Sequence, residues 1–170
     1  MIALKLKWFV LILCLSLASC MELGFKDAMP LNETDLKEFP ADLQGWYVAM
    51  TDGKDTIEVM ATRVSADRFV LDGKNVMRKF GKYYVCNQNK LGRWNIALIK
   101  PTCRGFSLYS FDIYESKHRE IIRKLTNVME IKDEDGGLDY LLISPTNEEF
   151  GRLVKSKAFI KVEKFKRITK

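Results

Sequence analysis

Residues 82–100, KYYVCNQNKLGRWNIALIK, contain two apolar segments with a glycine between them. In the second segment Trp94, Ile96 and Leu98 occupy alternate positions, so their side chains share one face of an extended strand. The first segment covers residues 82–88 and has the same short, strand-like character. This pattern predicts two neighbouring antiparallel strands joined by a turn.

Similar short segments flank this stretch and are separated by turn sequences such as Asp52-Gly53 and Asp72-Gly73. An Asp-Gly pair between extended segments is typical of a tight turn. Further strands are expected at residues 46–48, 56–64, 68–71, 75–80 and 106–114. The predicted fold class is therefore mainly β, or β-rich α+β, with an antiparallel meander that forms a barrel or a strongly curved sheet.

The periodicity changes toward the C-terminus. Residues 116–128 place apolar side chains at helical spacing, with Ser116 as a candidate cap, and so predict a short amphipathic helix. The remaining expected elements are a hairpin at 129–131 and 138–143, a second helix that follows the cap candidates of 144–149, and a strand at 159–168. One or two short helices should thus accompany the sheet.

The N-terminus has the pattern of an export signal. Lys5 and Lys7 precede an apolar run at residues 8–17. A helix needs about 20 residues to cross a hydrocarbon core of roughly 30 Å, so this run is too short for a permanent membrane span. A signal peptide that is later removed is the better interpretation.

The run ends in Leu17, Ala18, Ser19 and Cys20, which resembles the lipobox of bacterial lipoproteins. The resemblance implies cleavage before Cys20 and attachment of acyl chains to that cysteine. Two or three chains would hold the protein durably at a membrane. The alternative is an ordinary secretory signal that leaves Cys20 as a thiol.

The lipobox resemblance also implies a location. An aspartate after the lipidated cysteine favours retention in the inner membrane, and this chain has Met21 there. We therefore expect a protein of the cell envelope that is lipid-anchored in the outer membrane, on its periplasmic or its surface face.

The expected organisation is a signal peptide at 1–19, a lipid anchor and tether at 20–40, and a single β-rich domain at 41–170. Removing residues 1–19 leaves 151 residues, which suffice for one hydrophobic core. The tether is predicted because the segment lacks periodicity and contains Pro30 and Pro40. Two of its apolar residues, Leu36 and Phe39, could still pack against the domain.

The composition, with 47% hydrophobic and 11% aromatic residues, is that of a globular protein. The formal net charge is +6, and about +4 without Lys5 and Lys7. A nucleic-acid-binding protein normally has a sharper basic stripe with interleaved aromatic residues. We therefore expect no nucleic-acid partner.

Two cysteines, Cys86 and Cys103, remain when Cys14 leaves with the signal and Cys20 carries lipid. In an oxidising compartment such a pair usually forms a disulfide, which is the tentative prediction here. A tight hairpin at 82–100 would argue against the disulfide. Cys86 would then face a residue near one end of the second strand, whereas Cys103 would lie in the next turn, at the opposite end of that strand.

No set of residues predicts catalysis, a metal or a cofactor. His118 is the only histidine and is expected to be solvated, and the chain has no glycine-flanked nucleophilic serine. The acidic segment 133–139 could suggest calcium, but Asp135-Gly136 is explained by a hairpin turn. Glu148 and Glu149 fit the first turn of a helix. The chain is therefore not expected to be an enzyme.

Aromatic residues on the expected strands could line a ligand pocket or simply fill a core. They are Trp46, Tyr47, Phe69, Tyr83, Tyr84, Trp94, Phe106, Tyr109 and Phe111. Residues 42–50, in which Gly45 directly precedes Trp46, loosely resemble the first strand of lipocalins, although the lipocalin spacing has one residue between the two. The predicted function is non-catalytic binding or a structural role in the envelope, with a protein, peptidoglycan or lipid partner. A lipocalin-like carrier of a small apolar ligand is the alternative.

Overall fold

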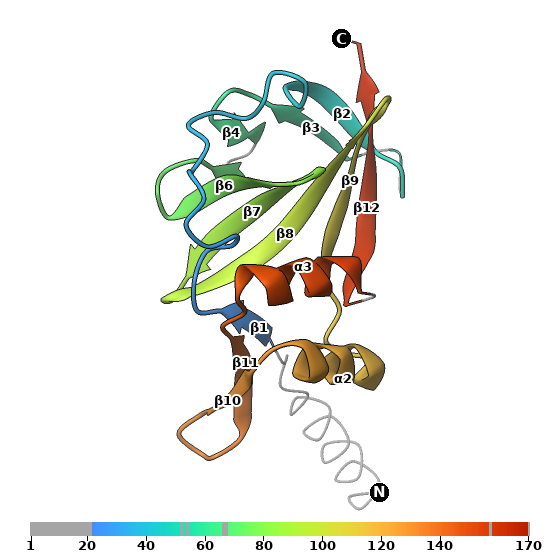
Figure 1. Cartoon of the computed structure of the whole chain (residues 1–170). Helices are drawn as coiled ribbons and strands as arrows, with labels where there is room; N and C mark the ends of the chain where they lie inside the picture. Colours follow the sequence, from blue (N-terminus) through green and yellow to red (C-terminus); the bar gives the residue numbers. More distant parts are fainter. Residues whose placement is uncertain (1–21, 52, 54, 66–67, 157, 170) are drawn as a thin grey trace, which may run out of the picture.

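The computed structural model describes residues 22–51, 53, 55–65, 68–156 and 158–169. These residues form a 12-stranded, strongly curved sheet with two short helices late in the chain (Figure 1). The sheet is not closed into a barrel, because no hydrogen-bonded pairing joins β5 to β6 among the described residues. The predicted β-rich fold class is confirmed, in its curved-sheet form.

The strands pair in the order β10-β11-β1-β8-β9-β12-β2-β3-β4-β5. Two strands lie off this path: β7 pairs with β8, and β6 pairs with β7. Neighbours are antiparallel except β1 and β11, which are parallel. The strands are β1 (Glu22–Phe25), β2 (Gly45–Ala49), β3 (Thr56–Val59), β4 (Arg63–Val64), β5 (Phe69–Val70), β6 (Asn75–Phe80), β7 (Tyr83–Lys90), β8 (Arg93–Thr102), β9 (Gly105–Phe111), β10 (Val128–Lys132), β11 (Leu138–Ile143) and β12 (Phe159–Ile168).

The hairpin predicted at residues 82–100 is formed by β7 and β8. Lys90 pairs with Arg93, so Leu91 and Gly92 alone make the turn. Both have positive φ, 52° and 79°, which matches the right-handed twist of a two-residue hairpin. This tight turn fixes the register of the whole hairpin.

The hairpin is apolar on both faces. Val85, Ile96 and Leu98 belong to a core that packs against the helices. The alternate residues Cys86 and Ile99 belong to a second core on the opposite face. The sheet therefore separates two cores, and its strands carry nearly continuous apolar runs.

The helices are α2 (Ser116–Leu125) and α3 (Asn147–Lys155). Thr146 caps α3 through a capping box with Glu149, as the cap candidates predicted. Phe150 and Leu153 are buried and hold α3 against the sheet, with α2 beside it (Figure 1). At α2 the N-cap is Glu115 and not Ser116, and no side chain bonds the first turn.

The predicted tether at 20–40 differs from the structure. Residues 22–25 form β1 between β11 and β8, and Phe25, Met29 and Phe39 are buried. Within the described residues, the compact part of the chain thus begins at Glu22 rather than near residue 41.

Polar side chains from distant elements explain this difference. The buried Asn87 side chain accepts from the Met29 N–H at 2.7 Å and donates to the Met29 carbonyl at 2.8 Å. Asn147 makes the same pair of bonds with Leu31, at 2.6 and 3.0 Å. The Arg78 guanidinium donates to the carbonyls of Ala28 and Pro30. Such side-chain bonds order a segment that has no periodicity of its own.

Candidate functional site

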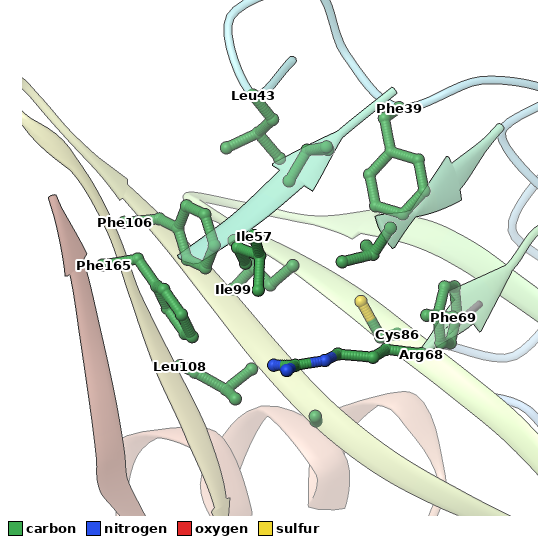
Figure 2. A pocket seen from close by; sticks show the side chains of 13 residues that line it. Phe39, Leu43, Ile57, Arg68, Phe69, Cys86, Ile99, Phe106, Leu108 and Phe165 are labelled. Atoms are coloured by element: carbon green, nitrogen blue, oxygen red, sulfur yellow. The ribbon is translucent and has the colours of Figure 1, made fainter. Parts of the chain in front are cut away.

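The face of the sheet opposite α3 lines a partly open apolar cavity of about 230 Å³. Strands β3, β4, β5, β7, β8, β9 and β12 contribute to its wall, and the segment before β2 covers one side (Figure 2). The lining residues are Phe39, Leu43, Ile57, Val59, Val64, Arg68, Phe69, Cys86, Ala97, Ile99, Phe106, Leu108 and Phe165.

Strand alternation and side-chain size together create this space. Cys86 and Ala97 are directly paired on β7 and β8, so two small side chains lie side by side in the wall. Phe106 and Phe165 pair across β9 and β12 with ring centroids 4.9 Å apart and form the opposite side. Large side chains on one wall and small ones on the other leave a hollow instead of a filled core.

Tyr47 and Arg167 support the wall behind Phe106. The fully buried Tyr47 ring lies 4.9 Å from the Phe106 ring, and its hydroxyl donates to the Leu43 carbonyl at 2.8 Å. Arg167 lies over the Tyr47 ring and donates to its hydroxyl at 2.7 Å. Burial raises the pKa of Tyr47, against the lowering effect of Arg167, so the neutral phenol is favoured here. Gly45, at φ 138°, leaves room for the Arg167 guanidinium.

Arg68 is the charged residue of the cavity lining. Its guanidinium extends from the β5 side in the direction of Leu108 (Figure 2). It donates two hydrogen bonds to the Asp55 carboxylate, at 2.8 and 2.9 Å. The two side chains are 49% and 40% exposed, so the pair lies where the cavity meets solvent. The hydrogen bond from Arg68 lowers the pKa of the Asp55 carboxyl.

The tentative disulfide between Cys86 and Cys103 is not formed. Both are free: Cys86 is buried in the cavity wall, and Cys103 is exposed in the turn between β8 and β9. The tight β7–β8 turn is the reason, because it pairs Cys86 with Ala97 and leaves Cys103 at the far end of β8. The structure thus agrees with the expectation that a tight hairpin at 82–100 would prevent the disulfide.

The two thiols should differ strongly in reactivity. Burial raises the pKa of Cys86 from 9.0 to about 12, which lowers its thiolate fraction about a thousandfold. We expect a maleimide to label Cys103 within minutes in the native, unreduced protein, and to label both residues only after denaturation. Mass mapping of the labelled peptides measures this. Failure to label either cysteine after denaturation without reductant would instead indicate a disulfide.

The other candidate residues lie outside the cavity. His118 was expected to be solvated but is buried, with Nδ1 3.4 Å from the Asp112 carboxylate. Asp133 closes the β10–β11 turn by accepting from the Gly137 N–H at 2.6 Å. No group of three or more histidine, cysteine or acidic residues in the described ranges could hold a metal.

Among the predicted aromatic residues, Phe69 and Phe106 line the cavity, and most of the others fill the two cores. Phe39 and Leu43 precede β2 and lie outside the predicted strands, and Arg68 starts a predicted strand but was not expected to line a pocket. The apolar character of Phe39, which allowed it to pack against the domain, was the nearest signal in the sequence.

Comparisons with protein-family models, with curated proteins and with solved structures find no match to this chain. No helix among the described residues has both the length and the apolar character needed to cross a bilayer. The fold and the site therefore define the class directly: a strongly curved β-sheet protein with an apolar cavity that is partly open to solvent.

Proposed function

We propose that this protein is a non-catalytic binding protein that holds one small apolar molecule in the cavity. The observation that supports this function is a space of about 230 Å³ whose lining is apolar except at Arg68. An apolar cavity of about 150 Å³ can stay dry and bind benzene, and sites for drug-sized ligands begin near 300 Å³. The cavity therefore suits a ligand somewhat larger than a single aromatic ring.

We also propose that the protein acts at the cell envelope, anchored through acyl chains on Cys20. The support is the lipobox-like sequence of residues 17–20 behind a basic start and a short apolar run. These residues lie outside the described ranges. A binding protein held at a membrane would be close to the apolar molecules that partition there.

Titration of the purified full chain with 1-octanol tests the binding function. We expect saturable binding of one molecule, and Ala97→Phe should weaken it at least about thirtyfold because the new ring fills the cavity. Ala97→Val should give a smaller loss, which keeps the test informative if the phenylalanine variant folds poorly.

Met129→Phe is the matched control, because it adds an aromatic ring at a 57% exposed position on β10. Its affinity should equal that of the unmodified protein. Equal octanol binding by both Ala97 variants and the unmodified protein, or no saturable binding at all, would refute the proposal.

Replacing Cys20 with alanine tests the anchor. We expect the Cys20→Ala chain to keep residues 1–19 and to lack acyl groups, which intact-mass measurement would detect. Cys103→Ala changes an exposed thiol of the domain and should leave processing unchanged. A Cys20→Ala product with the mass and membrane partition of the unmodified protein would contradict the anchor.

A further inference from the structure

We infer that the ligand is a monocarboxylic acid with a medium-length apolar body, and that Arg68 binds its carboxylate in place of Asp55. This inference rests on the proposed function, since it concerns the same cavity. It adds the chemical class of the ligand and assigns a specificity role to one ion pair.

The position of Arg68 is the first argument. Arg68 is the charged lining residue, and its half-exposed side chain lies where the apolar cavity meets solvent. The Arg68 side chain extends in the direction of Leu108 (Figure 2), so at the mouth of the cavity its guanidinium can reach the polar end of a ligand whose apolar body lies inside. A ligand with a polar end at this point and an apolar body beyond it would match the lining on both counts.

The Asp55 carboxylate shows which polar end fits. It binds the two terminal nitrogens of Arg68 as a fork, at 2.8 and 2.9 Å, which is the geometry that any carboxylate adopts with a guanidinium. A ligand carboxylate can take over the same two donors. The charge balance of the arginine is then kept, whereas a dianion would leave excess negative charge beside an apolar wall.

The exchange is physically accessible because Asp55 is replaceable. The Arg68–Asp55 pair is about half exposed, and exposed ion pairs contribute little net stability. The Asp55 carboxylate is 40% exposed, so it can give up the two Arg68 donors when a ligand binds, while the apolar body of the ligand gains burial in the cavity. Asp55 thus holds Arg68 in place when the cavity is empty and competes weakly with the ligand.

The cavity volume limits the size of the apolar body. A methylene group takes about as much room as a water molecule, roughly 30 Å³, so about eight such groups fill the space. An eight-carbon acid, or a cyclic acid of similar volume, is the expected class.

Calorimetric titration of the full chain with octanoate and with 1-octanol at pH 8 tests this inference. Unmodified protein should bind octanoate at least as tightly as octanol, since the ligand carboxylate replaces the Asp55 carboxylate in the charge-assisted fork. Arg68→Gln should weaken octanoate binding about tenfold, because the fork is lost, and keep octanol binding. Asp55→Asn should bind octanoate several-fold more tightly than the unmodified protein, because the competing carboxylate is gone, with octanol unchanged.

Arg123→Gln removes a similarly exposed, ion-paired arginine on α2 and should behave as the unmodified protein. An octanoate affinity that Arg68→Gln leaves unchanged would overturn the role of Arg68 and leave the apolar binding function standing. Absence of saturable binding by either ligand would overturn both.

Discussion

Replacing Asn87 with leucine is expected to lower the free energy of unfolding by about 3 kcal/mol, although leucine has a similar size. Asn87 is fully buried and bonds both the N–H and the carbonyl of Met29. The leucine would leave those two backbone groups buried without partners, at about 1–3 kcal/mol each. Urea unfolding measures the change, and hydrogen exchange at the Met29 amide should speed up in parallel.

Asn89→Leu is the matched control, because it makes the same change two residues along β7. The Asn89 side chain accepts only a long bond, 3.3 Å, from the Gly92 N–H at the exposed turn. Its loss should cost less than about 1 kcal/mol. Equal effects of the two variants would mean that the Asn87–Met29 bonds do not order the 26–40 segment.

Most of the strands were predictable because they carry their own local signals. Alternating apolar residues, Asp-Gly turns and the cap sequence before α3 identified both helices and most strands from β2 onward, although the single strand predicted at 56–64 is divided into β3 and β4. β1 gave no such signal, because four residues are too few to establish a period. Its place is set by parallel pairing with β11, more than a hundred residues later in the chain.

The cavity was only partly predictable for a related reason. Strand alternation indicates which side chains share a face, and Phe106 was among the residues expected to line a pocket or fill a core. Whether a face is filled or hollow depends on the sizes of side chains that meet across the curve of the sheet, such as Ala97 and Phe165. Arg68 near a short strand has no sequence pattern that distinguishes it from an ordinary surface arginine.

Phe150→Ala is expected to cause the largest loss of stability, about 4 kcal/mol, which is typical of a buried phenylalanine reduced to alanine. Phe150 of α3 is fully buried, and its ring lies 5.2 Å from Phe80, 6.2 Å from Phe25 and 6.3 Å from Phe159. These three rings belong to β6, β1 and β12, so one side chain joins α3 to three separate strands. Thermal and urea unfolding measure the loss.

Two further variants separate packing from other effects of changing α3. Phe150→Leu keeps most of the buried volume and should cost less than half as much, whereas Arg152→Ala changes an exposed position of the same helix and should cost about 0.5 kcal/mol or less. Because Phe150 lies on the face of the sheet opposite the cavity, octanol affinity of the folded Phe150→Leu protein should stay within about twofold of the unmodified value. A large loss of affinity in this variant would show that the two cores are coupled through the sheet, and that the shape of the cavity depends on how α3 is packed.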